Sequence, residues 1–262
     1  VTGVQTCALP ISSSDDQTLS GVISGSGTIT KNTSTSSTLT VTGGNSYTGT
    51  TTLSTGVLAI SNSTSLGGSS AGQGTTVSSN ATLSVSGDIS SAEPLSISGD
   101  GVTVSSAEVG AIRNTSGSNT LSGAITLGAA TEVQIDTGST LTMSGGFTGN
   151  TFGLTIDGVG DSTISGAIAT TTGTLTKQGG GTLTISATNT YTGTTTVSAG
   201  TLTLGAAGAI SDSSALVVAN NATFNLAGYN ETVASVATST SRDRKSTRLN
   251  SSHLVISYAV FC

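Results

Sequence analysis

The residues that could do chemistry in this chain are few and far apart. Its only histidine is His253, and its two cysteines are Cys7 and Cys262. Asp157 and Asp161, in the segment DGVGD, have a spacing found in parts of calcium-binding loops, where carboxylates and carbonyls surround a hard cation. A single pair offers too few ligands, and Asp-Gly is also a common turn. We therefore predict no metal site and no bound cofactor.

A catalytic centre is equally hard to assemble. Arg113 is isolated among the predicted strands and could act as the base of a polysaccharide lyase, but such an enzyme also needs a cluster of carboxylates in a cleft. A glycosidase needs only two carboxylates, so the composition does not exclude one. The acidic residues are dispersed, however, and Asp15 and Asp16 are interpreted as a solvated lead-in. We assign no catalytic residue and expect a protein that is not an enzyme.

Lysine and asparagine residues recur in matched pairs. Lys31 and Lys177 each precede a turn, and we expect them to blunt a sheet edge or to pair locally. Asn45 and Asn189 occupy equivalent turns, where their amides could bond to neighbouring turns as ladders. Both pairs are thus predicted to serve the fold.

Two tyrosines recur in the same way. Tyr47 and Tyr191 both lie in N-x-Y-T-G segments. Sugar-binding sites often use exposed aromatic rings, but a turn tyrosine beside a glycine can equally cover the backbone. We therefore predict that the two rings pack over Gly49 and Gly193.

The two ends of the chain resemble foreign sequence. VTGVQTCALPI (Val1–Ile11) is what a commercial DNA-sequencing adapter would encode, and DRKSTRLNSSH (Asp243–His253) resembles the adapter for the opposite end. We interpret residues 1–11 and 243–262 as artefacts and residues 12–242 as one domain. All cysteine and histidine lies in the excluded ends, so the domain cannot form a Ser-His-Asp triad.

The charge balance restricts the possible partners. The chain has 13 acidic and 7 basic residues and a net charge of −6. Residues 12–242 retain twelve acidic residues and four basic ones, Lys31, Arg113, Lys177 and Arg242. Four scattered cations cannot neutralise a run of phosphates, which excludes nucleic acid as a partner. The chain contains no run of eighteen apolar residues, so we expect no transmembrane helix.

Short alternating runs predict the elements that must position all these residues. In GTLTKQGGGTLTISATNTYTGTTTVSAGTLTLG (Gly173–Gly205), aliphatic residues alternate with Thr or Ser, the period of a strand with one buried face. The pattern recurs upstream at a constant offset of 144 residues, which aligns Leu39 with Leu183. Frequent Gly, Asn and Ser residues break the chain too often for helices.

The alternation also continues between the two copies. Val102–Val104 is one of the predicted strands, Leu66–Gly74 is a predicted loop, and Pro94 should interrupt pairing because proline lacks an amide hydrogen. Two or three strands make one turn of roughly twenty residues, and successive turns stack in parallel about 4.8 Å apart. The sequence therefore predicts an all-β fold, a β-solenoid of short strands.

The segment Gly173–Gly205 closely resembles the passenger-associated transport repeat, or autotransporter-associated β-strand repeat, of bacterial surface proteins. The upstream copy is weaker, because TSTSS replaces the Gly-rich turn after its lysine. The resemblance implies a right-handed parallel β-helix that is exported through an outer-membrane barrel lying outside this sequence. The repeat has no catalytic residues to carry over.

The resemblance suggests three functions. The first is a structural stalk at the cell surface or outside the cell, whose repeats assist export and folding and which presents a distal module. The alternative is an adhesin that binds surface glycans or matrix through its Thr-rich faces or through Leu66–Gly74. A carbohydrate-active β-helix enzyme is the third, and we favour the stalk.

Overall fold

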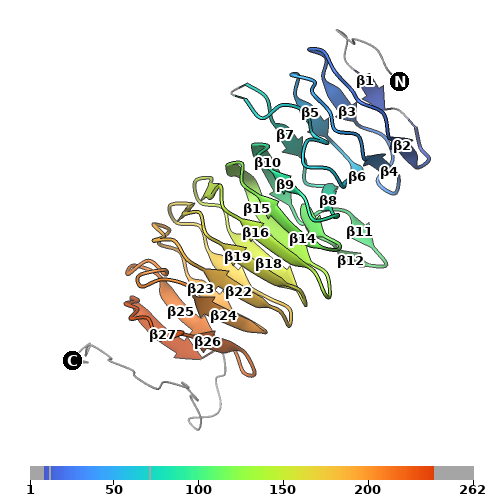
Figure 1. Ribbon diagram of the computed structural model, residues 1–262. Helices are drawn as coiled ribbons and strands as arrows, with labels where there is room; N and C mark the ends of the chain where they lie inside the picture. The colour runs from blue at the N-terminus through green and yellow to red at the C-terminus, as the bar shows by residue number, and fades with distance from the viewer. Residues whose placement is uncertain (1–8, 12, 71, 239–262) are drawn as a thin grey trace, which may run out of the picture.

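The computed structural model describes residues 9–11, 13–70 and 72–238, and in these residues every regular element is a β-strand. The strands are short, and nearly all of them pair in parallel with strands of the turns before and after (Figure 1). The predicted β-solenoid is confirmed. No helix in the described residues is long and apolar enough to span a membrane.

The solenoid has three faces, each a column of stacked parallel strands. The first face consists of β1 (Leu9–Ile11), β3 (Ile29–Lys31), β5 (Thr51–Leu53), β7 (Thr75–Val77), β10 (Leu95–Gly99), the start of β15 (Ile125–Ile135), β17 (Phe147–Thr148) and β20 (Ile168–Ala169).

The second face is the longest column and runs through the whole stack. It consists of β2 (Gln17–Leu19), β4 (Thr38–Val41), β6 (Gly56–Ile60), β8 (Ala81–Val85), β13 (Ile112–Asn114), the end of β15, β18 (Leu154–Gly158), β21 (Leu175–Lys177), β23 (Thr195–Val197), β25 (Ala215–Val218) and β27 (Ser235–Thr238).

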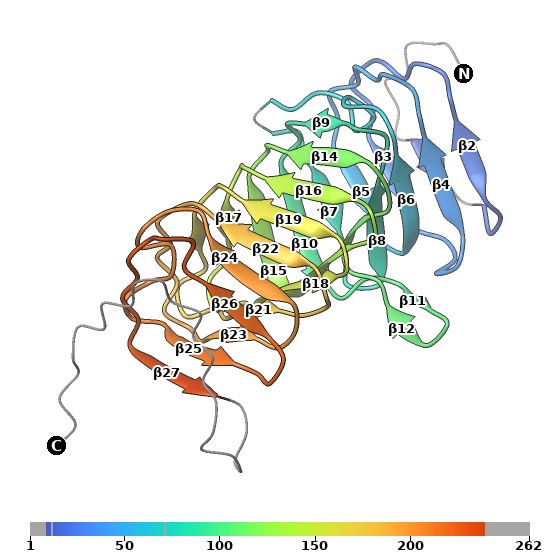
Figure 2. The same cartoon turned by 60° about the horizontal axis from the view of Figure 1, so that its bottom comes forward.

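The third face begins later in the chain. It consists of β9 (Ser90–Ser91), β14 (Ser118–Leu121), β16 (Thr140–Met143), β19 (Asp161–Ile164), β22 (Thr182–Ile185), β24 (Thr201–Leu204) and β26 (Thr223–Asn225). Figure 2 shows this column as a ladder of arrows from β9 to β26.

The core is a set of inward-facing rows, one side chain per turn. Alternation at period two turns every second residue inward, and parallel pairing in register stacks those residues on each other. On the second face one such row contains Leu39, Leu58, Leu83, Ile112, Val133 and Ile156, and all of them are buried. Each buried side chain contributes about 2 kcal/mol of hydrophobic stabilisation, which only the stacked neighbours make available.

One predicted strand forms, but its expected place in the stack is wrong. The run that includes Val104 does not join the stack but forms an antiparallel hairpin, β11 (Thr103–Val104) and β12 (Ala107–Glu108), which projects from the solenoid in Figure 2. Val104 is 48% exposed. The turn residues Ser105 and Ser106 both have positive φ, the conformation of a tight hairpin turn, and this local geometry overrides the apolar alternation.

The proposed division of the chain at residues 11 and 243 stays a prediction. Leu9–Ile11 pairs in parallel with β3 at the end of the first face. An open sheet edge pairs with any extended segment, so this contact is compatible with either origin of the segment. Residues 1–8 and 243–262 lie outside the described residues.

Candidate functional site

The candidate site is a hollow on the second face, where β13, β15 and β18 adjoin. Its volume is ≈ 540 Å³, and it is open to solvent. It is lined by Arg113, Thr115, Gln134, Ile135, Asp136, Thr137, Gly158 and Val159. The lining is therefore mostly polar, and it includes the exposed side chain of Val159.

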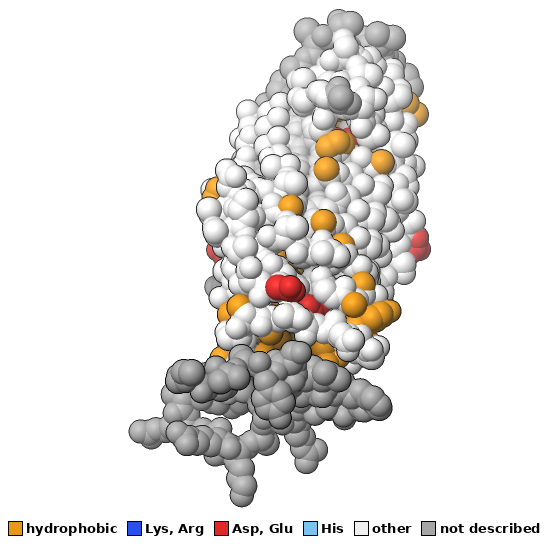
Figure 3. Space-filling model, turned by 90° about the vertical axis from the view of Figure 1, so that its left-hand side faces the viewer, with side chains coloured by type: hydrophobic (Ala, Val, Ile, Leu, Met, Phe, Trp, Pro, Cys, Tyr) orange, Lys and Arg blue, Asp and Glu red, His pale blue; other side chains and the backbone are white. Residues whose placement is uncertain are grey.

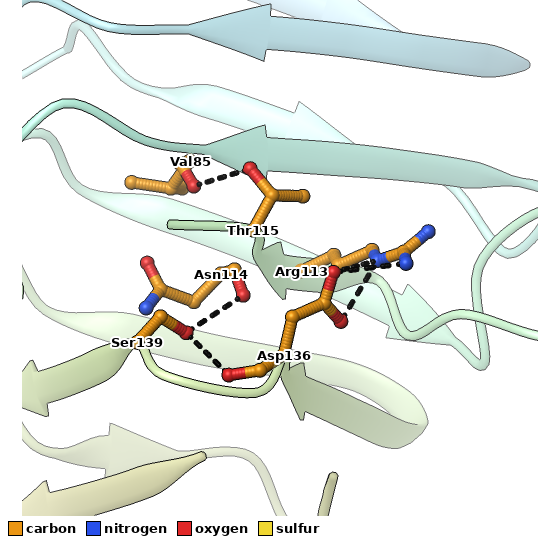
Figure 4. Close-up of polar contacts among 6 residues, drawn as sticks. All are labelled: Val85, Arg113, Asn114, Thr115, Asp136 and Ser139. Atoms are coloured by element: carbon orange, nitrogen blue, oxygen red, sulfur yellow. Dashed lines mark hydrogen bonds and ion pairs between the residues drawn. The ribbon is translucent and has the colours of Figure 1, made fainter. Parts of the chain in front are cut away.

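Arg113 is held by a carboxylate of the next turn. Arg113 occupies the outward position of β13, and Asp136 follows directly after β15. Arg113 Nη2 lies 2.9 Å from Asp136 Oδ2, and Arg113 Nε lies 3.1 Å from Oδ1 and 3.0 Å from Oδ2 (Figure 4). Both side chains are partly exposed, so the pair contributes up to about 1 kcal/mol of stability.

The corner behind this pair is fixed by hydroxyl groups. Ser139 Oγ donates to the carbonyl of Asp136 at 2.7 Å and approaches that of Asn114 at 3.2 Å, while Thr115 Oγ1 donates to the carbonyl of Val85 at 3.2 Å (Figure 4). These contacts link three successive turns. The arrangement around Arg113 thus ties turns together and leaves its guanidinium engaged by Asp136, which gives the lyase interpretation no support.

The acidic residues of DGVGD do not converge on a common point. Asp157 Oδ1 accepts a hydrogen bond from the amide of Gly158 at 2.6 Å, and Asp161 Oδ1 accepts one from the amide of Thr182 at 2.7 Å. Across the described residues, no group of three or more His, Cys, Asp and Glu side chains could hold a metal ion. The two carboxylates therefore act as turn residues.

Glu132 was missed by the sequence reasoning. It is partly buried on β15, and burial raises its pKa to about 7, with further increases from the nearby charges of Asp157, Asp100 and Glu108. Asp100 and Glu108 lie at the two ends of the hairpin formed by β11 and β12, which was not predicted from the sequence, so this group of acidic residues was not expected.

The two lysines lie inside the solenoid. Lys31 is 3% exposed and Lys177 2% exposed, so the expectation that they blunt an edge is wrong. The expectation of local pairing is confirmed: Lys31 Nζ donates to the carbonyl of Thr33 and to Ser37 Oγ, both at 2.9 Å, and Lys177 Nζ donates to the carbonyls of Gln178 and Gly179.

Burial controls the charge of these lysines. Removal from water lowers the pKa of both, while the negative charges of Asp16 near Lys31 and of Asp157 and Asp161 near Lys177 oppose that decrease. Each ammonium group thus acts as an internal clamp for a turn. The alternation of the sequence could not predict a buried lysine, because the neighbouring turns carry an aliphatic residue at the position that each lysine occupies.

The tyrosines are buried as well. Tyr47 and Tyr191 are almost fully enclosed, and their hydroxyls bond to Thr51 Oγ1 at 2.5 Å and to Thr195 Oγ1 at 2.7 Å. Burial raises the pKa of both, that of Tyr191 to about 12. The ring of Tyr47 lies against Gly67, where an added Cβ would lie 2.9 Å from the ring.

The glycines of the tyrosine turns lie against the backbone of the preceding turn. Gly49 is required by the close approach of two turns, because a Cβ there would collide with the carbonyl of Gly27 in the preceding turn. Gly193 stands in the same relation to Gly173. The packing of the tyrosine rings over Gly49 and Gly193 stays a prediction. Neither tyrosine ring is accessible to a sugar.

The asparagine ladder is confirmed. Asn45 Oδ1 accepts from the amide of Ile23 at 2.8 Å in the preceding turn, and Asn45 Nδ2 donates to the carbonyl of Ser65 at 2.7 Å in the following turn. Asn189 bridges Ile168 and Ala209 in the same manner.

A third bridging asparagine was not predicted. Asn119 Oδ1 accepts from the amide of Ile89 at 2.8 Å, and its Nδ2 donates to Asn114 Oδ1 at 2.6 Å and to the carbonyl of Ser116 at 2.7 Å. Its place two residues before Leu121 put it on the inward side of a strand, and an amide there must bond to the backbone. The inward position of Asn119 in the alternating pattern could therefore have indicated its bridging role.

Away from the hollow, the surface is largely uncharged. Figure 3 shows one side of the molecule on which hydroxyl, amide and backbone atoms predominate, with isolated acidic groups and no visible lysine or arginine. On the third face Thr120, Thr142, Thr163, Thr184 and Thr203 follow one another in register on five successive strands. They are partly exposed, and their hydroxyls have no hydrogen bond within the described residues.

Comparison with known proteins agrees with this architecture. The family model described as the passenger-associated transport repeat matches residues 36–60 and 175–204. The first match includes β4 and β6, and the second runs from β21 to the end of β24. Neither the curated proteins nor the solved structures gave a significant match. The chain thus carries two passenger-associated transport repeats within a β-solenoid, consistent with an autotransporter passenger repeat protein.

Proposed function

We propose that the solenoid is the structural stalk of a secreted, autotransporter-type passenger at the bacterial cell surface or outside the cell. Its repeats assist export and folding, and its length presents a distal module. The observation that supports this proposal is that both matched repeats are built into one continuous stack of parallel strands. Each contributes two strands to the second face, β4 and β6 in the first match and β21 and β23 in the second.

The bonding between turns suits a chain that folds while it is exported. Each new turn pairs with a turn already formed, and the bridging amides of Asn45 and Asn189 bond to the turns on both sides. Folding can therefore advance along the stack one turn at a time. The partner that this proposal requires is an outer-membrane translocator barrel, through which the unfolded chain passes.

The polar groups of the described residues support a structural and not a catalytic role. Arg113 is paired with Asp136, both lysines clamp turns, and Tyr47 and Tyr191 are enclosed. We accordingly infer that the solenoid has no catalytic activity.

Export can be tested by removing one whole turn at a time. Deletion of residues 175–194 removes a turn of the matched repeat, because Leu175 pairs with Thr195, and it leaves Thr195 in register with Leu154. Deletion of residues 131–153 removes a turn outside the matches, because Thr131 pairs with Leu154. Both variants keep three intact faces.

The two variants, fused to a translocator barrel, are compared for protease-accessible passenger on intact cells. The proposal predicts that loss of 175–194 lowers surface display well below that of the 131–153 deletion, while both purified solenoids retain β-sheet circular dichroism. Equal surface display of the two deletion variants would contradict a special role of the matched repeat in export.

A second candidate function is adhesion to a neutral glycan. The in-register threonine row of the third face supports it, because unbonded hydroxyls repeat there at one strand spacing, about 4.8 Å, without charge. Binding to a glycan array that is lost in a Thr163→Lys, Thr184→Lys variant would support adhesion. Absence of binding leaves the stalk as the function.

A further inference from the structure

Glu93 is a buried carboxyl group with only half of its hydrogen bonds made. It lies at the corner between β9 and β10 and is 5% exposed. Glu93 Oε1 accepts a hydrogen bond from Thr75 Oγ1 at 2.9 Å, whereas Oε2 is buried and has no partner within the described residues. A negative charge in this place is costly, because the side chain is shielded from solvent and the described residues offer it no second donor.

Within the described residues no charged group compensates Glu93, since apart from burial its pKa responds only to the Thr75 hydrogen bond. β7 presents Thr75, β10 presents Leu95, and the next turn places the backbone of Gly123 so close that a Cβ there would collide with the carbonyl of Glu93. The titratable group that faces Glu93 is Tyr47, two turns away, whose hydroxyl bonds to Thr51 beside Thr75. A tyrosine and a threonine can accommodate a neutral carboxyl group, and neither neutralises a carboxylate.

The stack is also irregular here. β9 has only two residues, Pro94 has no amide hydrogen to donate, and after Gly99 the chain leaves the stack to form the hairpin of β11 and β12. β9 is, in addition, the first strand of the third face in the described part of the chain, so the preceding turns have no ladder there to continue. β9 pairs only with β14 within the described residues, whereas β10 pairs with both β7 and β15. Local opening is therefore least opposed at the β9 end of this turn, beside Glu93.

We propose that the turn formed by residues 90–97 is a proton-sensitive seam of the solenoid, closed while Glu93 is neutral and locally opened when Glu93 loses its proton. Opening exposes the carboxylate to water and loosens the junction between the turns before β9 and those after β10. The stalk thereby gains one place of pH-dependent flexibility. This inference rests on the fold and holds whether or not the chain is a stalk.

The pH range follows from the sign of the effect. Burial raises the pKa of Glu93 from 4.5 to about 7, against a smaller opposing effect of the Thr75 hydrogen bond. A raised carboxyl pKa means that the closed turn is most stable below about pH 4.5 and loses that stability as the pH rises to about 7. Above about pH 7 the carboxyl group is ionised in both the closed and the open turn, so the stability of the closed turn no longer changes with pH.

Hydrogen–deuterium exchange of the full chain tests the seam. Protection factors of residues 90–97, corrected for the intrinsic pH dependence of exchange, are compared at about pH 5 and about pH 8. We expect protection to fall at least tenfold at the higher pH, the change that one unit of pKa shift produces. Glu93→Gln keeps the shape without the charge and should stay protected at both pH values, whereas Glu108→Gln on the exposed hairpin should behave as wild type.

A second variant keeps the test decisive if Glu93→Gln folds poorly. Thr75→Val removes the one donor to the carboxylate, so the midpoint of the pH-dependent exchange should move upward. Protection of residues 90–97 that is the same at both pH values in the wild type would overturn the seam. So would a pH dependence that survives in Glu93→Gln.

Discussion

Leu39 and Leu183 hold the same place in the two matched repeats and yet lie on different faces of the solenoid. Leu39 pairs with Leu58 on the second face, whereas Leu183 pairs with Leu202 on the third. The offset of 144 residues between the copies therefore equals a number of whole turns plus one face. The stack accepts this rotation because all three faces are parallel sheets with the same inward alternation.

The rotation moves the asparagine corner along with the repeat. Asn45 lies between β4 and β5, at the level of the third face, whereas Asn189 continues the first face, where its amide bonds to Ile168 at the start of β20. Each copy therefore carries its own means of joining the adjacent turns, independent of the face on which it lies.

Replacing Asn189 by alanine should lower the free energy of unfolding by about 2 to 4 kcal/mol, because the amide of Ile168 and the carbonyl of Ala209 both lose a buried partner. Urea denaturation followed by circular dichroism measures the change. Asn230→Ala, at an exposed position, is the matched control and should stay within about 0.5 kcal/mol of wild type. Equal losses in both variants would contradict the bridging role.

The sequence predicted the parts of the fold that depend on alternation alone. Leu183 and Ile185 alternate with threonine, and such alternation has one solution when one side of a strand is buried. It failed where a local interaction replaced the pattern. Lys177 occupies an aliphatic row because its long side chain reaches two turn carbonyls, and Val104 leaves the stack because two serines form a tight turn.

The candidate site was less predictable than the fold. Arg113 could be singled out by its type, but its partner Asp136 lies in the next turn, and the number of residues in each turn varies along the stack. The bridges that start from Asn45 and Asn119 show this variation, because they join residues 20 and 30 positions apart. Pairing across turns therefore needs the register, which the sequence alone does not give.

Close packing between turns makes Gly193 intolerant of a side chain. A Cβ at this position would collide with the carbonyl of Gly173 in the preceding turn, a backbone atom that cannot move without breaking the ladder. Gly138→Ala is the control, because its Cβ would meet open space and only its φ of +75° costs energy, about 1 kcal/mol. We expect Gly193→Ala to lower the thermal midpoint clearly more than Gly138→Ala, and the reverse order would contradict the packing argument.

The pair formed by Arg113 and Asp136 should show weak coupling that depends on salt. A double-mutant cycle with Arg113→Ala and Asp136→Ala should give a coupling energy of up to about 1 kcal/mol at low salt, because both groups are partly exposed. The coupling should decline in about 1 M salt, where exposed charges are screened. A coupling that is larger and insensitive to salt would mean that the pair is shielded from solvent and that the hollow is not open.

The buried amine of Lys177 should give the solenoid an alkaline stability effect. Its pKa is lowered in the folded chain, so above that pKa the unfolded chain binds a proton that the folded chain does not, and stability rises with pH towards 10.5. Urea midpoints of wild type and Lys177→Met, compared between about pH 8 and pH 9.5, should show a smaller rise in the variant. That range lies below the ionisation of Tyr191, whose raised pKa acts in the opposite direction. Lys31 contributes the same rise to both proteins, so the difference reports Lys177 alone, and parallel slopes would show that its ammonium group carries no penalty inside the stack.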